Sequence, residues 1–350
     1  MEQQPDDRFA QEMLHEVSRR LESLAAAAGR RGREPQYLLI KAWGFGFWSD
    51  VDHVLGSLLL AEITGRIPIV HWGANSLFSD DPTSNAWQSF FEPISNSTIE
   101  MIARDELSFF PPKWSSQNLR QAALNQNEGP WSRMAAIYLL HRPEVVAVAD
   151  FHVAVYGLLP YIPPDHAYHG LSAQQVYRAL VDKYLKPKAS ILEEVETFYE
   201  RHLAGAPVLA VHYRGSDKFR EDKRIDQTNA QYFEHLDAAV QEPGWRIFLL
   251  TDTAQAVQTF GERYGDRVVV TDCERSSDQV GVHKKAGGHR EQRGVQVMRD
   301  AYRQRDVFGP YVRVPCAARW VLDQLPEVHR LRIPEAAVRA VYAEPVADPV

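Results

Sequence analysis

The chain has 350 residues, of which 45% are hydrophobic and 24% are charged, a balance typical of globular proteins. One hydrophobic core rarely serves so many residues, so the length predicts two domains. A formal net charge of -7 gives no electrostatic reason to expect a nucleic-acid partner or binding to an anionic membrane surface. The 2 cysteines, Cys273 and Cys316, are too few for a disulfide framework.

Residues 1–34 are expected to form an amphipathic helix and a basic linker. Phe9, Met13 and Val17 fall on one stripe of a helix over residues 6–28. This segment is charged where a signal peptide would be apolar, and no apolar run of the chain approaches the roughly 20 residues of a membrane span. We therefore expect a cytoplasmic protein with no membrane span.

A strand, a glycine-containing loop and a helix are predicted next. The strand covers residues 37–40, and the helix follows Ser49 or Asp50 as its N-cap. Such a loop lets backbone N–H groups reach an anion at a helix N-terminus, so Gly44 and Gly46 are candidates for binding a donor ligand. Gly-x-Gly is also compatible with a plain tight turn, because the third glycine of a dinucleotide fingerprint is missing.

A strand over residues 67–72 precedes a segment that mixes aromatic side chains with amides and carboxylates. Proteins often bind sugars with aromatic faces beside carboxylates, because sugar C–H faces stack while the hydroxyls form hydrogen bonds. Trp87, together with Asp50 in the preceding loop, is therefore a candidate for contact with the acceptor of a sugar. The alternative use of Trp87 is core packing over the sheet.

Residues 145–155 form an apolar run that predicts a strand interrupted by Asp150 and His152. An internal histidine of this kind is more often a hydrogen-bonded packing residue than a catalyst. Two amphipathic helices are expected at residues 172–184 and 190–203, and they connect the two halves of the chain.

The expected domain boundary lies near Gly205, so that residues 35–204 form a Rossmann-like first domain and residues 205–325 a second. The second domain alternates strands and helices, which predicts a parallel, doubly wound sheet. Its strands begin at Val208 and cover residues 246–250 and 268–271, and its helices cover residues 232–240 and 255–264. Residues 326–350 are expected to form a C-terminal tail that is frayed beyond Val341.

Charged side chains gather where the strand from Val208 ends. They are His212, Arg214, Asp217 and Lys218. A guanidinium on a rigid strand end suits a diphosphate, because it pairs two oxygens at once and stays charged. Asp252 follows the next strand at the same edge of the sheet, so it and Arg214 can meet one donor molecule. The alternatives are a surface salt-bridge turn for the charged group and a helix N-cap for Asp252.

A long polar loop over residues 276–294 carries Lys284, Lys285 and Arg290, which suit a leaving-group phosphate when the loop becomes ordered. The histidines of this loop have poor spacing for a metal site. Asp300 follows in the middle of a largely apolar helix, where a carboxylate must find partners or project into a cleft.

Three blocks of the second half resemble one known family. Residues 212–218 resemble the motif His-x-Arg-Arg-Thr-Asp-Lys of the α-1,6-fucosyltransferases and of the wider superfamily that includes nodulation-factor and protein O-fucosyltransferases. The strand that ends in Thr251, Asp252 and Thr253 is similar to the second family motif, which ends in Thr-Asp-Asp. The segment from Gly294 to Asp306, which contains Asp300, resembles the third motif. The resemblance covers approximately residues 205 to 320.

The resemblance implies a GT-B fold, in which two Rossmann-like domains face a cleft, and inverting transfer of a sugar from a GDP-sugar, most often GDP-fucose. It implies no cofactor and no metal ion, because basic side chains replace the cation. The acceptor would be a glycan, a peptide or a small natural product.

The family's residue roles transfer to matching positions of this chain. Arg214 would bind the donor β-phosphate, His212 and Asp217 would belong to the same donor site, and Asp252 and Asp300 would contact the nucleotide side of the donor. Lys218 would relay the acceptor proton to Asp222, which holds the position of the family's catalytic glutamate and lies beside Glu221.

The chain departs from the family pattern at several positions. Gly215 stands where the family has a second arginine, so Lys284, Lys285 or Arg290 would have to supply that charge. Residues 311–314 replace a serine-rich turn that touches the phosphates. These departures keep open a non-catalytic nucleotide-sugar-binding protein of the same fold. A phosphotransferase is disfavoured, because a Walker motif and a pair of magnesium carboxylates are missing.

Overall fold

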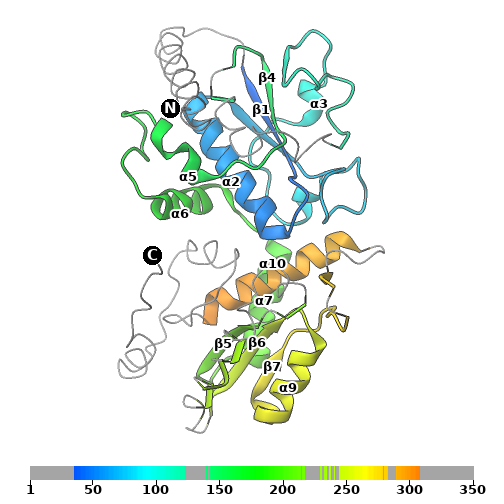
Figure 1. The fold of residues 1–350 in the computed structure, drawn as a ribbon, viewed down its shortest axis with the longest axis vertical. Helices are drawn as coiled ribbons and strands as arrows, with labels where there is room; N and C mark the ends of the chain where they lie inside the picture. Colours follow the sequence, from blue (N-terminus) through cyan, green and yellow to red (C-terminus); the bar gives the residue numbers. More distant parts are fainter. Residues whose placement is uncertain are drawn as a thin grey trace, which may run out of the picture. The chain divides into compact units, whose positions relative to one another are not determined.

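The computed structural model divides into two compact units between Lys186 and Pro187 (Figure 1), and each unit is described by itself. The expected amino-terminal helix and the tail lie outside the described residues. The structure describes residues 35–122, 139–140, 142–213, 215–216, 229–230, 232–234, 236–237, 240, 244–278, 280–282 and 289–307. Residues 302–307 are described by their backbone alone. Arg214, Asp217, Lys218 and Asp222 also lie outside these ranges.

The first unit is built on a parallel sheet in the order β2-β1-β4-β3. Its strands are β1 (Tyr37–Lys41), β2 (Ile67–His71), β3 (Phe109–Phe110) and β4 (Val146–Ala149). Tyr37 pairs with Ile67 on one side and with Val146 on the other. The apolar strands are typical of a sheet that is covered on both faces.

Successive side chains of these strands point to opposite faces, and each face has its own cover. Leu39 and Val148 pack in a cluster with Ile99, Ile102 and Trp114. On the opposite face α2 packs against the strands and against α5 and α6. The helices among the described residues of this unit are α2 (Phe47–Thr64), η1 (Ala86–Ser89), α3 (Ile99–Ile102), α5 (Val155–Leu158), η2 (Leu159–Tyr161) and α6 (Ala173–Tyr184).

Helix α2 begins earlier than the sequence predicts. Its N-cap is Gly46, with extended backbone angles, so the expectation that Ser49 or Asp50 caps the helix is wrong. Its predicted end is confirmed, because Gly65 adopts a left-handed conformation with φ 67° and its N–H bonds back to the last turn. Within the described residues no helix is both long and apolar enough to cross a bilayer.

The predicted strand over residues 145–155 is too long. Strand β4 contains only Val146–Ala149, and the chain then turns into α5. Asp150 and His152 therefore follow the strand instead of interrupting it. This places both side chains beyond the carboxyl end of a central strand, where α/β proteins bind ligands.

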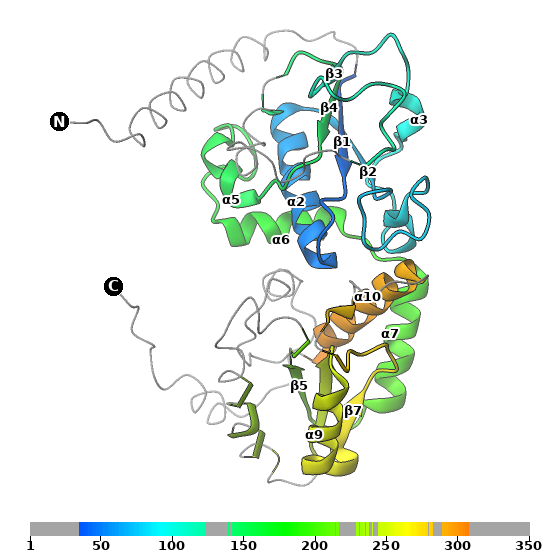
Figure 2. The same ribbon diagram turned by 45° about the vertical axis from the view of Figure 1, so that its right-hand side comes forward.

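The second unit contains the parallel sheet β5-β6-β7, as the alternating pattern predicts. Its strands are β5 (Val208–Tyr213), β6 (Arg246–Thr251) and β7 (Val268–Val270). Helix α9 (Ala254–Tyr264) lies on one face of the sheet and α7 (Ala189–His202) on the other, as Figure 2 shows. Phe260 of α9 and Phe198 of α7 pack against the strands. The short helix η4 (Gly265–Arg267) leads into β7.

Two boundaries in the second unit differ from the expected ones. Helix α7 packs against α10 (Arg290–Val307) and so belongs to the second unit, whereas the expected boundary near Gly205 assigns it to the first domain. Helix α10 begins at Arg290, so the polar loop is shorter than residues 276–294.

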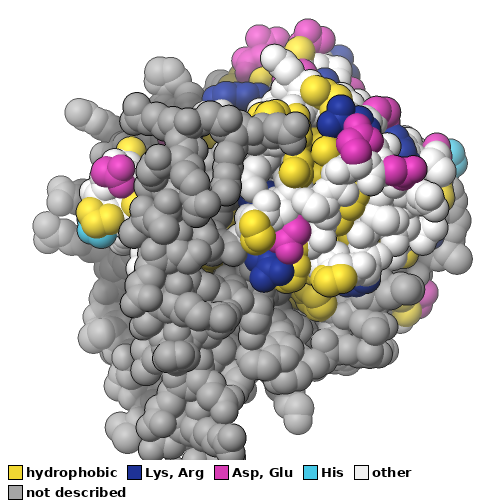
Figure 3. Space-filling model, turned by 90° about the horizontal axis from the view of Figure 1, so that it is seen from above, with side chains coloured by type: hydrophobic (Ala, Val, Ile, Leu, Met, Phe, Trp, Pro, Cys, Tyr) yellow, Lys and Arg dark blue, Asp and Glu magenta, His cyan; other side chains and the backbone are white. Residues whose placement is uncertain are grey.

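Charged side chains of both signs are mixed on the described surface. Seen from above in Figure 3, basic and acidic side chains lie next to one another on the part that is not grey. Arg104 and Glu106, 3.2 Å apart and 55% and 65% exposed, form one such ion pair. Exposed pairs of this kind contribute at most about 1 kcal/mol, so they do not determine the fold.

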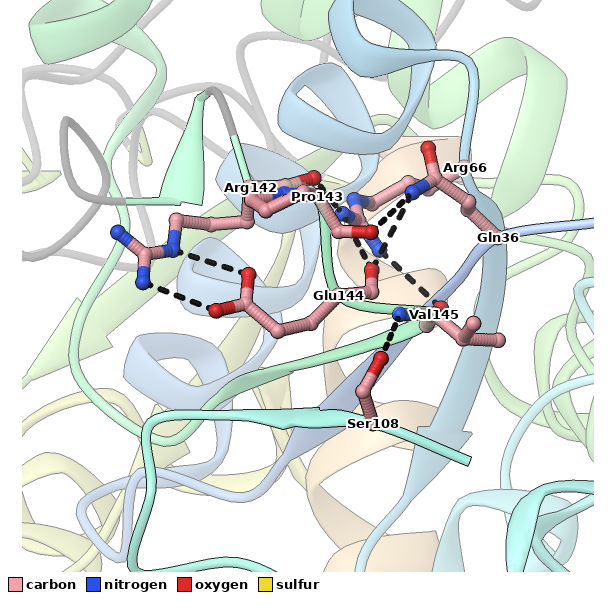
Figure 4. A network of polar contacts seen from close by, with 7 residues as sticks. All are labelled: Gln36, Arg66, Ser108, Arg142, Pro143, Glu144 and Val145. Atoms are coloured by element: carbon pink, nitrogen blue, oxygen red, sulfur yellow. Dashed lines mark hydrogen bonds and ion pairs between the residues drawn. The ribbon is translucent and has the colours of Figure 1, made fainter. Parts of the chain in front are cut away.

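Arg66 joins the amino ends of the strands in the first unit (Figure 4). It is 5% exposed, and its guanidinium donates to the carbonyl oxygens of Tyr37 at 3.0 Å and Val145 at 3.3 Å. It also donates to the carbonyls of Arg142 at 2.6 Å and Glu144 at 3.0 Å. Burial lowers the pKa of Arg66 to about 10, and its charge is stabilised by these four acceptors.

We expect Arg66→Ala to lower the free energy of unfolding by about 3 kcal/mol, because it leaves buried carbonyl groups without their charged donor. Thermal or urea unfolding of the full chain measures the loss. The control is Arg104→Ala, whose exposed ion pair should contribute less than about 1 kcal/mol. Equal stabilities of the two variants would show that the Arg66 network is not structural.

Candidate functional site

The first candidate site lies at the carboxyl edge of the second sheet, where the neighbouring strands β5 and β6 end. Tyr213 pairs with Thr251, so the loops that follow the two strands are neighbours. The Asp252 carboxylate accepts hydrogen bonds from the backbone N–H groups of Gly215 at 3.0 Å and Ser216 at 3.3 Å. Its second oxygen accepts the Ser216 hydroxyl at 2.7 Å. Asp252 thus holds the loop that directly follows Arg214.

Asp252 does not cap the helix after it. The N-cap of α9 is Thr253, so the alternative interpretation of Asp252 as an N-cap is wrong. The Asp252 carbonyl accepts the N–H of Ser276 at 2.8 Å, which joins a third loop to the same edge. Contact of Asp252 with a donor molecule stays a prediction.

Two positions at which the chain departs from the fucosyltransferase pattern lie next to each other. A Cβ atom on Gly215 would lie 2.8 Å from Cγ2 of Thr253, closer than real Cβ atoms approach other atoms. Gly215 replaces the second arginine of the first motif, and Thr253 replaces the last aspartate of the second. A side chain at position 215 therefore requires Thr253 to move. The two departures from the motif thus affect the same place in the structure.

Asp300 approaches the same edge from α10. Its carboxylate accepts a hydrogen bond from Gln296 at 2.8 Å. Burial and then the charge of Asp300 raise the pKa of the Cys273 thiol, which lies just beyond β7. His212 is partly buried near the end of β5, on the same strand face as Ala210. The structure therefore brings the described members of all three motif blocks into one unit.

Charged residues expected at this edge lie partly outside the described residues. Arg214, Asp217, Lys218 and Asp222 do so, and so do Lys284 and Lys285. Arg290 begins α10, and its neighbour Arg293 forms an ion pair with Glu274 at 3.0 Å. Among the described residues no group of three His, Cys, Asp or Glu side chains is arranged to hold a metal ion.

The glycine-containing loop of the first unit binds its own aspartate. Gly44 has a φ of 91°, and its N–H donates to the Asp50 carboxyl group at 3.0 Å, as does the N–H of Phe45 at 3.2 Å. This N–H is therefore used within the loop, and contact of Gly44 with a donor stays a prediction. Gly46 is the N-cap of α2, and its contact with a donor stays a prediction.

Asp50 and Trp87 are buried and cannot contact an acceptor. Asp50 is 0% exposed, and burial raises its pKa to about 8 even though backbone N–H groups favour the charged form. Trp87 is 1% exposed, with its ring stacked on Phe91 at 4.3 Å and edge-on to Trp72 at 5.0 Å. Both acceptor assignments are wrong, and the alternative of core packing is confirmed for Trp87.

A polar network that the sequence analysis missed lies at the carboxyl edge of the first sheet. Nε2 of His152, beyond β4, is 2.8 Å from one oxygen of Asp52 in α2. The other Asp52 oxygen accepts the Tyr177 hydroxyl at 2.7 Å. Burial, followed by the charge of Asp52, raises the pKa of Tyr177, so its hydroxyl remains a donor. The His152 and Asp52 side chains are 25% and 14% exposed.

Two neighbours in α2 hold the backbone beside His152. His53 accepts the N–H of Val153 on Nδ1 at 3.0 Å, and burial lowers the pKa of His53 to about 3, so this imidazole is neutral and able to accept. A Cβ atom on Gly56 would lie 2.0 Å from the carbonyl oxygen of Val153. The segment therefore packs directly on the helix backbone, which only glycine permits.

Aromatic side chains surround this network. The Trp43 ring stacks on His152 with centroids 4.5 Å apart, and Phe45 lies 4.1 Å from Trp43. Phe45 and Tyr156 are large aromatic side chains left 39% and 66% exposed. The sequence signals for this site were a histidine just after a strand and two aromatic residues in the glycine-containing loop.

The two parallel sheets with helices on both faces form an α/β fold, and comparison with solved structures confirms that fucosyltransferases share this fold. The fucosyltransferase NodZ from Bradyrhizobium is similar with a TM-score of 0.54 and 17% identity, over 84% of this chain and 95% of that chain. The NodZ alpha-1,6-fucosyltransferase structure soaked with GDP-fucose is similar with the same TM-score and identity, over 84% of this chain and 94% of that chain. No family model and no curated protein matches the sequence. The resemblance to the fucosyltransferase superfamily is thus confirmed at the level of the fold.

We expect the stability of the wild type to fall as the pH rises from about 4 to about 8 through the contribution of Asp50. The folded pKa of about 8 exceeds the unfolded value of about 4, so the folded protein holds a proton that the unfolded chain releases. Asp50→Asn should remove this contribution, at most about 1.4 kcal/mol per pH unit, in melting curves across this range. Asp182→Asn, at an exposed position of α6, should leave the slope unchanged.

We expect Gly56→Ala to destabilise the protein by about 2 to 3 kcal/mol, because the new methyl group overlaps the Val153 carbonyl. Gly157→Ala is the matched control, since a Cβ atom there meets no atom within 4 Å. Urea unfolding of both variants measures the difference. Similar stabilities would mean that α2 does not fix the position of the His152 segment.

Proposed function

We propose that this protein is an inverting glycosyltransferase that moves fucose or a related hexose from a GDP-sugar to a hydroxyl group of a glycan, peptide or small-molecule acceptor. The arrangement of the motif blocks at the carboxyl edge of β5 and β6 carries the proposal. Asp252 of the second block binds the backbone of the first at Gly215 and Ser216. The solved structure of similar fold that was soaked with GDP-fucose supports the choice of donor.

The proposed chemistry requires positive charge at the departing diphosphate. The acceptor oxygen attacks the anomeric carbon, and the bond between that carbon and the β-phosphate oxygen breaks with its electron pair leaving on GDP. A fixed cation at that oxygen acts more strongly in the transition state than in the ground state, and so raises turnover. Arg214 is the proposed cation, with His212 along the phosphates and Asp300 on the nucleotide side.

The described contacts fit a site that is arranged before the donor binds. Asp252 holds the two residues that follow Arg214, so the backbone on one side of the guanidinium is already positioned. An interaction that needs no rearrangement during the reaction contributes its full strength to the transition state. In this proposal Asp252 acts mainly as a positioning residue for Arg214.

A second candidate function is a non-catalytic nucleotide-sugar binder. The absence of a side chain at position 215 favours it, because the second arginine of the family motif is missing and a Cβ atom there would require Thr253 to move. Such a protein would bind GDP and GDP-fucose but would release no GDP from the sugar nucleotide. Release of GDP from GDP-fucose therefore distinguishes the two functions.

We expect GDP to raise the melting temperature more than UDP or TDP, because a ligand that binds only the folded protein stabilises it.

Arg214→Ala should lower GDP release from GDP-fucose on the order of 100-fold, the usual effect of removing a group that stabilises transition-state charge. Its melting temperature without ligand should match that of the wild type.

The control is Arg201→Ala, at an exposed position in the last turn of α7, which should retain full turnover. Near-normal turnover of Arg214→Ala would refute the assignment of the leaving-group cation. A larger thermal shift with UDP or TDP than with GDP would refute the GDP-sugar donor.

A further inference from the structure

We infer that a cavity beside the edge strand β2 is a binding site for a neutral carbohydrate. The cavity has a volume of about 450 Å³, and it is lined by β2, by parts of residues 83–100 and by Arg120. Sites for small molecules have volumes of about 300 to 1,000 Å³, so this cavity is large enough for one. All the residues involved belong to the first unit, and the donor of the proposed transfer takes no part.

The outer edge of β2 is closed to a further strand. In the described sheet β2 lies at the edge and pairs with β1. The Asn85 side chain donates to the Val70 carbonyl at 2.7 Å and accepts the Trp72 N–H at 2.8 Å. The Ser95 hydroxyl donates to the Pro68 carbonyl at 2.6 Å. Side chains thus occupy the groups that a neighbouring strand would use, which disfavours an extended peptide as the ligand.

One backbone donor of β2 remains available in the cavity. The N–H and the carbonyl of one strand residue point to the same side, so the N–H of Val70 points toward the outer edge, as its carbonyl does. No described residue accepts a hydrogen bond from this N–H. Val70 lines the cavity between the positions of Asn85 and Ser95, so its N–H suits an oxygen atom of a small ligand.

His71 is a second polar group that needs a partner. Its side chain lines the cavity and is 4% exposed, and its Nε2 is buried without a hydrogen bond to any described residue. Burial, and after it the positive charges of Lys41 and Arg120, lower the pKa of His71 to about 4, so the ring is neutral near pH 7. A neutral imidazole has one donor and one acceptor nitrogen, and a hydroxyl group can pair with either. A ligand hydroxyl would therefore satisfy His71.

The charges around the cavity favour an uncharged ligand. Glu100 and Arg120 are the charged side chains among the described lining residues, and they form an ion pair with each other. Because their charges cancel, neither an anion nor a cation gains a free counter-charge on entering. A nucleotide or a phosphorylated ligand is therefore disfavoured here.

The remaining walls combine apolar and polar surface. Pro93 and Ile94 supply apolar contacts, whereas Gln88, Asn96 and Ser97 supply amide and hydroxyl groups. Gln88 and Asn96 are exposed, and their side chains form no hydrogen bond to a described residue. A ligand that presents C–H groups on one side and hydroxyl groups on others matches such walls. An uncharged molecule of this kind is a carbohydrate.

The test titrates the full chain with neutral sugars in the absence of nucleotide, and ligand-observed NMR measures Kd. The probes are glucose, galactose, mannose, fucose and N-acetylglucosamine, with glucuronate and N-acetylglucosamine 1-phosphate as charged counterparts. We expect at least one neutral sugar to bind. Its charged counterpart should bind about 10-fold more weakly or less, because Arg120 is already paired with Glu100.

Two variants at exposed positions locate the bound sugar without disturbing the fold. Gln88→Ala and Asn96→Ala should each raise Kd about 2- to 10-fold, the effect of losing one hydrogen bond between neutral groups. The matched control is Gln117→Ala, which is also exposed but does not line the cavity, and its Kd should equal that of the wild type.

His71→Leu separates binding from stability. It should raise Kd about 10-fold, whereas the melting temperature without ligand should not fall, because the imidazole gives up no hydrogen bond within the described protein. A lower melting temperature with an unchanged Kd would show that His71 is structural and would overturn its role in binding. If His71→Leu fails to fold, Gln88→Ala and Asn96→Ala decide the outcome.

Three results would overturn the carbohydrate site. They are the absence of binding by every neutral sugar of the panel, equal or tighter binding of the charged counterparts, and a Kd that Gln88→Ala, Asn96→Ala and His71→Leu leave unchanged. Because no nucleotide is present, these results leave the proposed transfer from a GDP-sugar untouched. Conversely, a protein that binds a neutral sugar in this cavity but releases no GDP from GDP-fucose would retain the carbohydrate site and lose the proposed function.

Discussion

Parallel strand pairing is the constraint on which both candidate sites depend. In each sheet it places the carboxyl ends of all strands at one edge, so residues far apart in the sequence become neighbours there. In the second unit this edge joins Asp252 to Gly215 and Ser216. In the first unit it brings His152, just beyond β4, to Asp52 in the helix that follows β1. The opposite edge of the first sheet is closed by Arg66, which is fully engaged with backbone carbonyls.

The sequence predicts this scaffold well because its signals are local. Apolar runs identify β1, β2, β5, β6 and β7, whereas the two-residue strand β3 gives no such signal. Gly65 marks the end of α2 because a left-handed residue is needed there. Asp252 could be assigned to a ligand edge because it directly follows an apolar run. Strand ends and helix ends of this kind depend on a few adjacent residues, and such patterns are visible in one sequence.

Whether Asp50, Trp87 and His152 are buried or accessible depends on contacts that no local sequence pattern reveals. In the sequence Asp50 resembles a ligand-binding carboxylate. In the structure it is buried, and it accepts hydrogen bonds from the loop that precedes it. Trp87 looks like a sugar platform, but Phe91 covers its face. His152 looks like packing, because its partner Asp52 lies 100 residues earlier in the chain. Only the tertiary structure determines which polar side chain is used internally and which remains available.

The two units stabilise the loop after their first strand in the same way. Asp50 accepts hydrogen bonds from the backbone N–H groups of Gly44 and Phe45 beyond β1. Asp252 accepts hydrogen bonds from those of Gly215 and Ser216 beyond β5. Because a carboxyl group of the protein already occupies these donors, the loops do not offer these N–H groups to a phosphate. In the proposed function an anionic donor would therefore depend on side-chain cations, which is the role that the proposal gives to Arg214.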